Sequence, residues 1–476
     1  MSALLGRAKR PMVMVAAAAY SLILGAALLW FHYLPETVLL LTVGGIVVAL
    51  LILRPLVGVH ALILLLFLEY SEFLRGDVAG VTAMKAAGAV ILAGWLLSMA
   101  IHRRTRLRFD PLFIAMGLFV IWCGCTALYA LNQTIALTRF YTFIPLALTA
   151  MMVSSVVDSV NRMRGVYVAI VLWATLATIE AIGEYYAGRT RVVQGLLHDR
   201  NLLAAYINLA IIAAYILLLT VRQAVGRFLL VAVLPILFLG LFLTLSRAGL
   251  IVMFVAVLVV WYRMARERRF TLLLGSVALL CLISLILPEK FWKRAESIVP
   301  ELQRQEDTFG LRVYLWKIGA RMVADQPLTG VGAGNFVVAF PKYAQGRVVR
   351  RQLVAHNSYV SVAAEMGLIG LALFLSIHAL AFRNIYHAIR LARTVKDRPL
   401  ESMAVATEVC LLALMMGALA GSGEGMKCLW IVLGFSSSVA HMAGVKALEF
   451  QRASTGGNVA PPLPGVGTLG VAGISR

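Results

Sequence analysis

The sequence predicts an all-α protein, a polytopic bundle of about 12–14 transmembrane helices with one large periplasmic loop. Composition is the first reason: the 476 residues are 61% hydrophobic and 14% charged, whereas soluble domains are nearer half apolar and a quarter charged. Run length is the second, because apolar stretches long enough to cross ~30 Å of hydrocarbon recur along the chain. Backbone groups inside a bilayer must pair within their own segment, so these runs are expected to be helices.

The apolar runs give about fourteen candidate spans, with boundaries good to a few residues. Several are short, so the count falls to twelve if one pair is re-entrant or merges. The candidate spans are residues 12–31, 37–53, 55–69, 82–101, 111–131, 140–156, 165–186, 201–220, 227–244, 247–262, 271–287, 358–382, 403–420 and 427–446.

The formal net charge of +21 would suggest a nucleic-acid partner in a soluble protein. Here most basic residues form short clusters between spans, which is the positive-inside pattern of membrane proteins, so we expect no nucleic acid. Placing every cluster in the cytoplasm is consistent with alternate crossings and puts both termini inside. The clusters are Arg7–Arg10, His102–Arg108, Asn161–Arg164, Arg222–Arg227, Arg263–Arg269 and Arg383–Arg398.

This topology divides the chain into an N-terminal transmembrane bundle (1–288), a large periplasmic loop (289–357), C-terminal transmembrane helices (358–446) and a disordered cytoplasmic tail (447–476). The loop holds eleven Lys and Arg against six Asp and Glu. Long loops escape the positive-inside rule, and the excess indicates an anionic ligand. Within the loop, residues 310–324 read as an amphipathic helix with Leu311, Leu315 and Ile318 on one face, and residues 330–335 as a flexible turn.

Three arginines are candidates for binding that anion. Arg247 lies between two apolar runs, where an arginine costs ~2.5–3.5 kcal/mol at mid-membrane and so suggests function; an interface arginine is the alternative. Arg200 stands at the outer start of a span, beside Asp199, which could cap that helix. A helix N-terminus with an adjacent arginine favours anions. Arg139 enters its span from the same side.

His356 is the candidate catalytic residue. It follows the basic loop at the mouth of the bundle, and with an ordinary pKa near 6.5 it could accept a proton from a sugar hydroxyl. We expect no metal, because no histidine pair has helix-face spacing. The five cysteines show neither zinc spacing nor a disulfide framework and are expected to pack in apolar surroundings. Supporting candidates are Arg312, Asn357 and Asn201.

Three motifs in this order resemble the O-antigen ligase and polymerase superfamily. They are Ser246–Gly249, then Arg312 and Trp316 followed by residues 325–332, and then Ala355–Tyr359 running into Glu365–Gly367. The similarity covers about residues 195–385. In this resemblance His356 corresponds to the loop histidine of the family, Arg247 to the arginine of its Ser-Arg element, and Arg200 to an arginine at an outer helix start.

The resemblance implies a metal-independent inverting glycosyltransferase without cofactors. It would move a glycan from undecaprenyl diphosphate to lipid A–core oligosaccharide, a step of lipopolysaccharide biosynthesis, at the periplasmic face of a bacterial inner membrane. The donor diphosphate would bind Arg247, Arg200 and Arg139, and the other partners would be membrane lipids. Two alternatives stay open: a polymerase of the same superfamily that extends the glycan, and a polytopic transporter, which broken helices in repeats would support.

Overall fold

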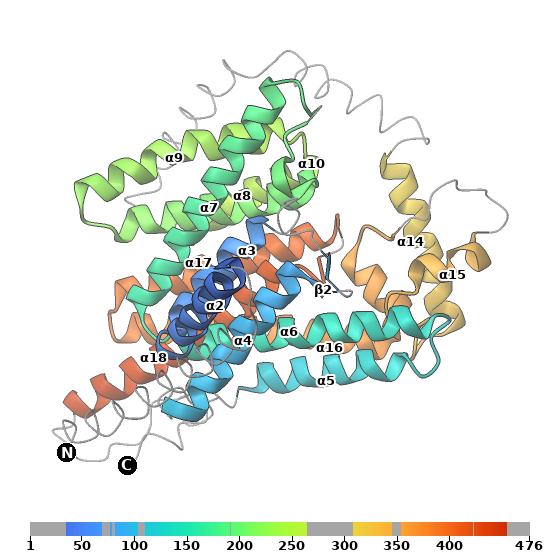
Figure 1. The fold of residues 1–476 in the computed structure, drawn as a ribbon, viewed down its shortest axis with the longest axis horizontal. Helices are drawn as coiled ribbons and strands as arrows, with labels where there is room; N and C mark the ends of the chain where they lie inside the picture. Colours follow the sequence, from blue (N-terminus) through green and yellow to red (C-terminus); the bar gives the residue numbers. More distant parts are fainter. Residues whose placement is uncertain are drawn as a thin grey trace.

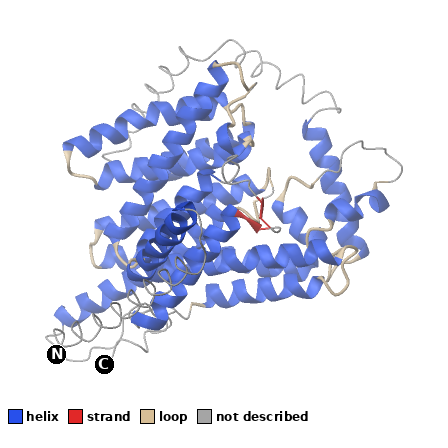
Figure 2. Ribbon diagram, in the orientation of Figure 1, coloured by secondary structure: helices blue, strands red, loops and turns tan. Residues whose placement is uncertain are grey.

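A computed structural model describes residues 35–68, 77–78, 81–102, 110–190, 192–263, 308–344, 354–421 and 423–454. Over these residues the chain is helical apart from short connections and one small antiparallel hairpin of β1 (Asp77–Val78) and β2 (Val81–Thr82). Figure 1 and Figure 2 show a bundle of helices with α14 (Thr308–Asp325) and α15 (Phe336–Tyr343) grouped at one side. The predicted all-α membrane bundle is confirmed.

Twelve predicted spans are helices in the structure. They are α2 (Pro35–Leu53), α3 (Pro55–Leu68), α4 (Ala83–His102), α5 (Pro111–Thr126), α6 (Gln133–Val156), α7 (Val160–Tyr186), α8 (Arg200–Thr220), α9 (Ala224–Leu243), α10 (Arg247–Arg263), α16 (Ser358–Thr394), α17 (Arg398–Ala418) and α18 (Lys427–Ser454). A short 3₁₀ turn, η2 (Gly195–Leu197), precedes α8. The predicted spans 12–31 and 271–287 and the tail beyond residue 454 lie outside the described residues.

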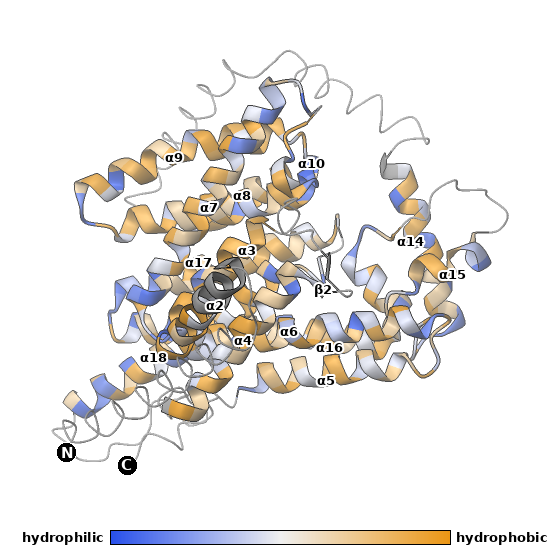
Figure 3. Ribbon diagram, viewed as in Figure 1, coloured by the Kyte–Doolittle hydropathy of each residue, from blue (hydrophilic) through white to orange (hydrophobic). Residues whose placement is uncertain are grey.

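By length and apolarity, eight of the described helices could each cross a membrane, or up to nine if a bent pair counts as one span. That pair is Gly44–Leu53 with Pro55–Leu68, bent by 118°. Proline restricts the residue before it to extended conformations, and here Arg54 separates two helices at Pro55. The bend agrees with the alternative, left open by the sequence, that one pair of short spans is re-entrant or merges. Figure 3 shows apolar colour along most helices of the bundle.

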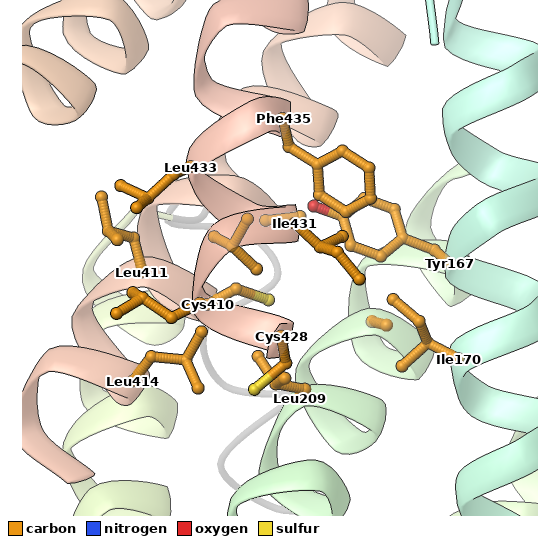
Figure 4. Close-up of a cluster of buried hydrophobic side chains, with 14 of the residues drawn as sticks. Tyr167, Ile170, Leu209, Cys410, Leu411, Leu414, Cys428, Ile431, Leu433 and Phe435 are labelled. Carbon is orange, nitrogen blue, oxygen red and sulfur yellow. The ribbon is translucent and has the colours of Figure 1, made fainter. Parts of the chain in front are cut away.

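The core joins helices that are distant in the sequence. Tyr167 on α7 packs its ring 5.4 Å from that of Phe435 on α18, and its hydroxyl lies 3.1 Å from Thr407 Oγ1 on α17. Cys410 and Cys428 are buried free thiols in the same cluster, as Figure 4 shows. These two cysteines are therefore packing residues, as predicted.

Helix α16 connects two ends of the bundle. Near one end Asn384 Nδ2 donates to Asp110 Oδ2 at 2.7 Å, next to the predicted cytoplasmic clusters 102–108 and 383–398. Near the other end Trp122 Nε1 donates to the Met366 carbonyl at 2.8 Å. We call the second the loop end, because α14 (Thr308–Asp325) and α15 (Phe336–Tyr343) lie there.

Helix α14 confirms the predicted loop helix, and only part of its apolar face is buried. Leu315, Ile318 and Met322 are buried in one cluster with Val360 and residues of α16. Leu311, which the pattern placed on that face, is 38% exposed. The spacing of apolar residues predicts a helix, but it does not show how far along α14 a partner helix packs. Leu311 lies one turn before the part of α14 that this cluster buries.

Candidate active site at the loop end of the bundle

Three helices at the loop end begin in the same way. A non-glycine residue with positive φ comes first, a polar residue follows, and the helix starts next: His198 (φ 50°) before α8, Leu245 (φ 52°) before α10 and His356 (φ 48°) before α16. Non-glycine residues seldom adopt this left-handed conformation; among the described residues the only other one is Lys396 (φ 55°), which precedes α17 in the same way. These starts contain Arg200, Arg247 and His356, which were the three principal predicted site residues.

The polar residue in each start caps its helix. Asp199 accepts from the backbone N–H groups of Asn201 (2.7 Å) and Leu202 (3.3 Å), which confirms the capping role considered for it. Ser246 Oγ accepts from Gly249 N–H at 3.2 Å. A side-chain oxygen in this position pairs backbone donors that the first helical turn leaves open.

Asn357 caps α16 by accepting from Tyr359 N–H at 3.0 Å and Val360 N–H at 3.2 Å. It is 7% exposed. The residue predicted to support the site therefore fixes the backbone directly after His356.

Hydrogen bonds connect the N-terminal ends of α8 and α10 directly. Ser246 Oγ donates to Asn201 Oδ1 at 2.8 Å, and Asn208 Nδ2 donates to the Gly249 carbonyl at 3.0 Å. The helices approach so closely that a Cβ on Gly249 would lie 2.7 Å from Ala204 Cβ. Arg200 and Arg247, the first residues of these two helices, are thereby held at the same end of the bundle, and each is half-buried.

His356 lies in a backbone segment that α14 holds. Trp316 Nε1 donates to the Ala355 carbonyl at 3.1 Å. Burial lowers the pKa of His356 below its ordinary value and the nearby Arg312 lowers it further, against the opposing effect of Asp199. The structure thus brings His356, Arg312 and the start of α8 within electrostatic range of one another. A lowered pKa leaves the imidazole neutral at pH 7.

Arg139 lies in the second turn of α6, against the glycine-rich turn at residues 330–335. A Cβ on Gly334 would meet Arg139 Cγ at 2.8 Å. Glu365 holds this turn by accepting from Gly334 N–H (2.7 Å) and Phe336 N–H (3.3 Å). Arg139 and Glu424 both act electrostatically on Glu365, so these three charged groups form one neighbourhood.

The turn predicted at residues 330–335 is present, but many contacts hold it in place, so it is not the flexible turn that was expected. Gly330, Gly332 and Gly334 have φ of 68°, 100° and 72°, which glycine adopts without a steric penalty. Asn335 Oδ1 accepts from Asn132 N–H at 2.7 Å, and its Nδ2 donates to the Asn132 carbonyl at 3.2 Å. The turn is thus bound both to the α5–α6 connection and to α16.

A cavity of about 280 Å³ lies between α6, α8, α10 and the connection from α17 to α18. Its polar lining residues are Arg139, Asp199, Asn201, Asn208, Ser246, Glu424 and Lys427. Ser358 Oγ donates to the carbonyl of Gly421, another lining residue, at 3.1 Å. The cavity therefore shares a wall with the segment that carries His356. Of the predicted site residues, Arg139 and Asn201 line it, whereas Arg200, Arg247, Arg312, Asn357 and His356 do not.

Sequence reasoning passed over Asn208 and Glu424. Both are buried, at 2% and 7% exposed, and both line the cavity. The sequence contained a feature that could have indicated each of these two residues. Asn208 is a polar residue inside an apolar run, and Glu424 is an acidic residue in the short glycine-rich connection between two predicted spans. Polar groups at such places are rare and usually functional.

Residues 232–375 match the family model described as O-antigen ligase. No curated protein matches the chain. The matched segment contains Arg247, Arg312, His356 and Asn357, while Arg139, Arg200 and Asn201 lie before it. The predicted resemblance to the O-antigen ligase and polymerase superfamily is confirmed over this segment.

Proposed function

From the O-antigen ligase match at residues 232–375, we propose that the chain is an O-antigen ligase. It would move a glycan from undecaprenyl diphosphate to lipid A–core oligosaccharide, without a metal or nucleotide. The observation that carries the proposal is the meeting of three strained helix starts at one end of the bundle. Two of them bring Arg200 and Arg247, and the third brings a histidine whose pKa is lowered.

The donor diphosphate would bind at the starts of α8 and α10. The planar guanidinium fork matches two phosphate oxygens at once and stays charged at every physiological pH. Both arginines are first residues of their helices, where the partial positive charge of the helix dipole adds to the attraction for an anion. Arg139, on the cavity side of the same region, would be the third cation.

His356 would act as the general base. The acceptor hydroxyl attacks the anomeric carbon of the donor sugar on the face opposite the diphosphate, which inverts the configuration there. The new C–O bond forms as the bond to the diphosphate oxygen breaks, and the diphosphate leaves with that electron pair. The hydroxyl proton moves to the neutral imidazole of His356 and then to solvent. Arg312 favours the neutral imidazole, because it lowers the pKa of His356.

Fixed positive charge at the diphosphate stabilises the charge that develops on it in the transition state. The energy for transfer is already present in the activated phosphoester of the donor, so no nucleotide is required. The family match favours an enzyme over the transporter alternative, because it is a match to a glycosyltransferase-like family.

We place the site at the periplasmic face of a bacterial inner membrane. In support, Arg263 and Asn384, which belong to predicted cytoplasmic clusters, lie at the opposite end, where Asn384 pairs with Asp110 and the Arg263 guanidinium lies 5.5 Å from the centre of the Tyr386 ring. In a background without the five native cysteines, Leu328→Cys should react with an impermeant thiol reagent in intact cells. Lys446→Cys should react only after permeabilisation. The reverse pattern would put the site in the cytoplasm and contradict the proposal.

The decisive test uses purified protein in lipid nanodiscs with lipid-linked glycan and lipid A–core oligosaccharide, without nucleotide. Appearance of glycan on lipid A–core supports ligation. Growth of the lipid-linked glycan with no product on lipid A–core would identify the polymerase of the same superfamily instead. Absence of any transfer with an intact donor would reject both enzymes.

A further inference from the structure

The cavity beside the arginines contains two buried oxygen atoms that lack hydrogen-bond partners among the described residues. They are Asn208 Oδ1 and Glu424 Oε2, and both side chains line the cavity. Buried polar atoms in folded proteins nearly always have a partner, and leaving one without a partner is unfavourable. Both atoms therefore need a hydrogen-bond donor that the cavity can admit.

Neighbouring contacts hold both groups in place. The amide nitrogen of Asn208 is occupied by the Gly249 carbonyl at 3.0 Å, so its oxygen is the atom that remains available. The backbone of Glu424 is fixed by Trp430 Nε1, which donates to its carbonyl at 3.0 Å. Two acceptors that separate elements hold in the lining of one cavity are preorganised for a ligand with several donors.

The diphosphate itself does not meet this need. Its oxygens only accept hydrogen bonds, and its charge would be repelled by the Glu424 carboxylate. A prenyl chain has no donors at all. A sugar ring carries several hydroxyl donors around an apolar ring face, and the lining also offers apolar area from Leu202, Tyr206 and Met426.

Resting on the proposed function, we propose that this cavity binds the sugar ring joined directly to the donor diphosphate, with Asn208 and Glu424 accepting from its hydroxyl groups. The volume of about 280 Å³ is near the lower bound of ~300 Å³ for small-molecule pockets, which suits one ring. Position agrees as well: Asn201 and Ala248 line the cavity and directly follow Arg200 and Arg247 in the sequence.

The test compares two ligands, a short-chain prenyl diphosphate and the same lipid with one sugar on the diphosphate. Binding of each to nanodisc-embedded protein is measured by titration. Wild type should bind the sugar-bearing lipid on the order of tenfold more tightly, as expected for two net hydrogen bonds. Asn208→Leu and Glu424→Gln should each lose roughly three- to tenfold for that lipid and leave the bare diphosphate lipid unchanged. Arg247→Lys should weaken both lipids.

Glu449→Gln is the matched control, because it makes the same chemical change on α18 at an exposed glutamate that pairs with Lys446 at 3.3 Å. It should behave as wild type. Wild-type binding of singly deoxygenated sugar lipids adds a measurement that needs no variant to fold. At least one missing hydroxyl should weaken binding by a similar factor.

Three outcomes would overturn the inference. Equal wild-type affinity for the two lipids would mean that the cavity holds only water or prenyl chain. Equal affinity for every deoxygenated analogue would remove hydroxyl recognition. Variants that raise the KM for the acceptor glycolipid alone would assign the cavity to the acceptor sugar. Binding of neither lipid by wild type would instead reject the proposed donor, a result distinct from the other three.

Discussion

Helix α10 begins with Arg247 and ends with Arg263, and these two arginines have opposite electrostatic surroundings. Arg263 lies at the C-terminal end, where the helix dipole favours a cation, and forms an ion pair with Glu408 on α17. Arg247 lies at the N-terminal end, where the dipole disfavours a cation. The comparison separates an arginine held in an ion pair at a helix C-terminus from one at a helix N-terminus, where the dipole favours an anion.

The same contrast extends to the two ends of the bundle. At the Arg263 end, charged and polar side chains of different helices pair, as in Arg263–Glu408 and Asn384–Asp110. At the loop end, the buried oxygens of Asn208 and Glu424 have no hydrogen-bond partner among the described residues and line a cavity of about 280 Å³. Glu408 Oε2 is also buried without a hydrogen-bond partner among the described residues, but Glu408 does not line that cavity.

The largest expected effect concerns His356. His356→Ala and His356→Gln should each lower turnover by roughly 10²–10⁴-fold while donor binding changes little, because general-base assistance is lost. His60→Gln on α3 is the control, since His60 Nδ1 pairs with the Leu56 carbonyl of its own helix at 2.9 Å. Steady-state transfer and donor titration measure the two quantities. Near-normal turnover of the glutamine variant would show that His356 orients the acceptor without accepting a proton.

The two arginines of α10 give the next effect. Arg247→Lys should lower transfer by roughly 10–100-fold, because lysine retains the charge but not the two-pronged geometry. Arg263→Lys should retain transfer, because it keeps a cation beside Glu408. Both variants are assayed at equal amounts of folded protein. Equal activity of the two would remove the functional distinction between the ends of α10.

For the stability of the fold we expect the opposite ranking, with Arg263 mattering more than Arg247. Arg263→Met leaves the Glu408 carboxylate, which is 5% exposed as a side chain, without its cation, and should destabilise the fold by about 3–5 kcal/mol. Adding Glu408→Met should recover most of this loss, because an apolar pair of similar volume is often tolerated. Thermal unfolding in detergent measures both variants. A single variant as stable as wild type would show that the pair contributes little.

A smaller effect concerns pH. Burial lowers the pKa of His356 and Arg312 lowers it further, so the neutral, reactive imidazole persists to lower pH than for an ordinary histidine. Arg312→Gln should raise that pKa, and the acid side of the rate profile should move to higher pH by a fraction of a unit, consistent with a screened charge. The variant should therefore lose more rate at pH 6 than at pH 8. A profile lowered equally at all pH values would assign Arg312 to ligand binding instead.

The last prediction is that removing metal ions has no effect on transfer. Chelators should leave transfer unchanged, because the arginines and helix termini are proposed to supply all the positive charge at the diphosphate. Transfer is compared with and without chelator and after readdition of magnesium. Activity abolished by chelator and restored by magnesium would contradict the metal-independent mechanism.

The fold was largely readable from the sequence because apolar run length is set by bilayer thickness alone. That one pair of short runs could be re-entrant or merge was foreseen, but not that the break falls between α2 and α3. The exposure of Leu311 was not predicted, because periodicity does not say how far a partner helix covers α14. The cavity was not predicted, since it depends on close approaches between distant segments, such as Ser246 with Asn201 and Asn335 with Asn132. No spacing in the sequence encodes those pairs.

The glycine-rich turn constrains the order in which this protein can fold while it is being synthesised. Val331 N–H donates to the Ala364 carbonyl and Gly332 N–H to the Glu365 carbonyl, at 2.9 and 2.8 Å, and Leu368 N–H donates back to the Pro327 carbonyl at 2.8 Å. These partners belong to α16, which comes later in the chain than the turn and α15. Residues 327–335 therefore cannot complete their backbone pairing until α16 has been synthesised and inserted. A ribosome stalled before residue 368 would leave the chain with its helix starts made and its catalytic end unassembled.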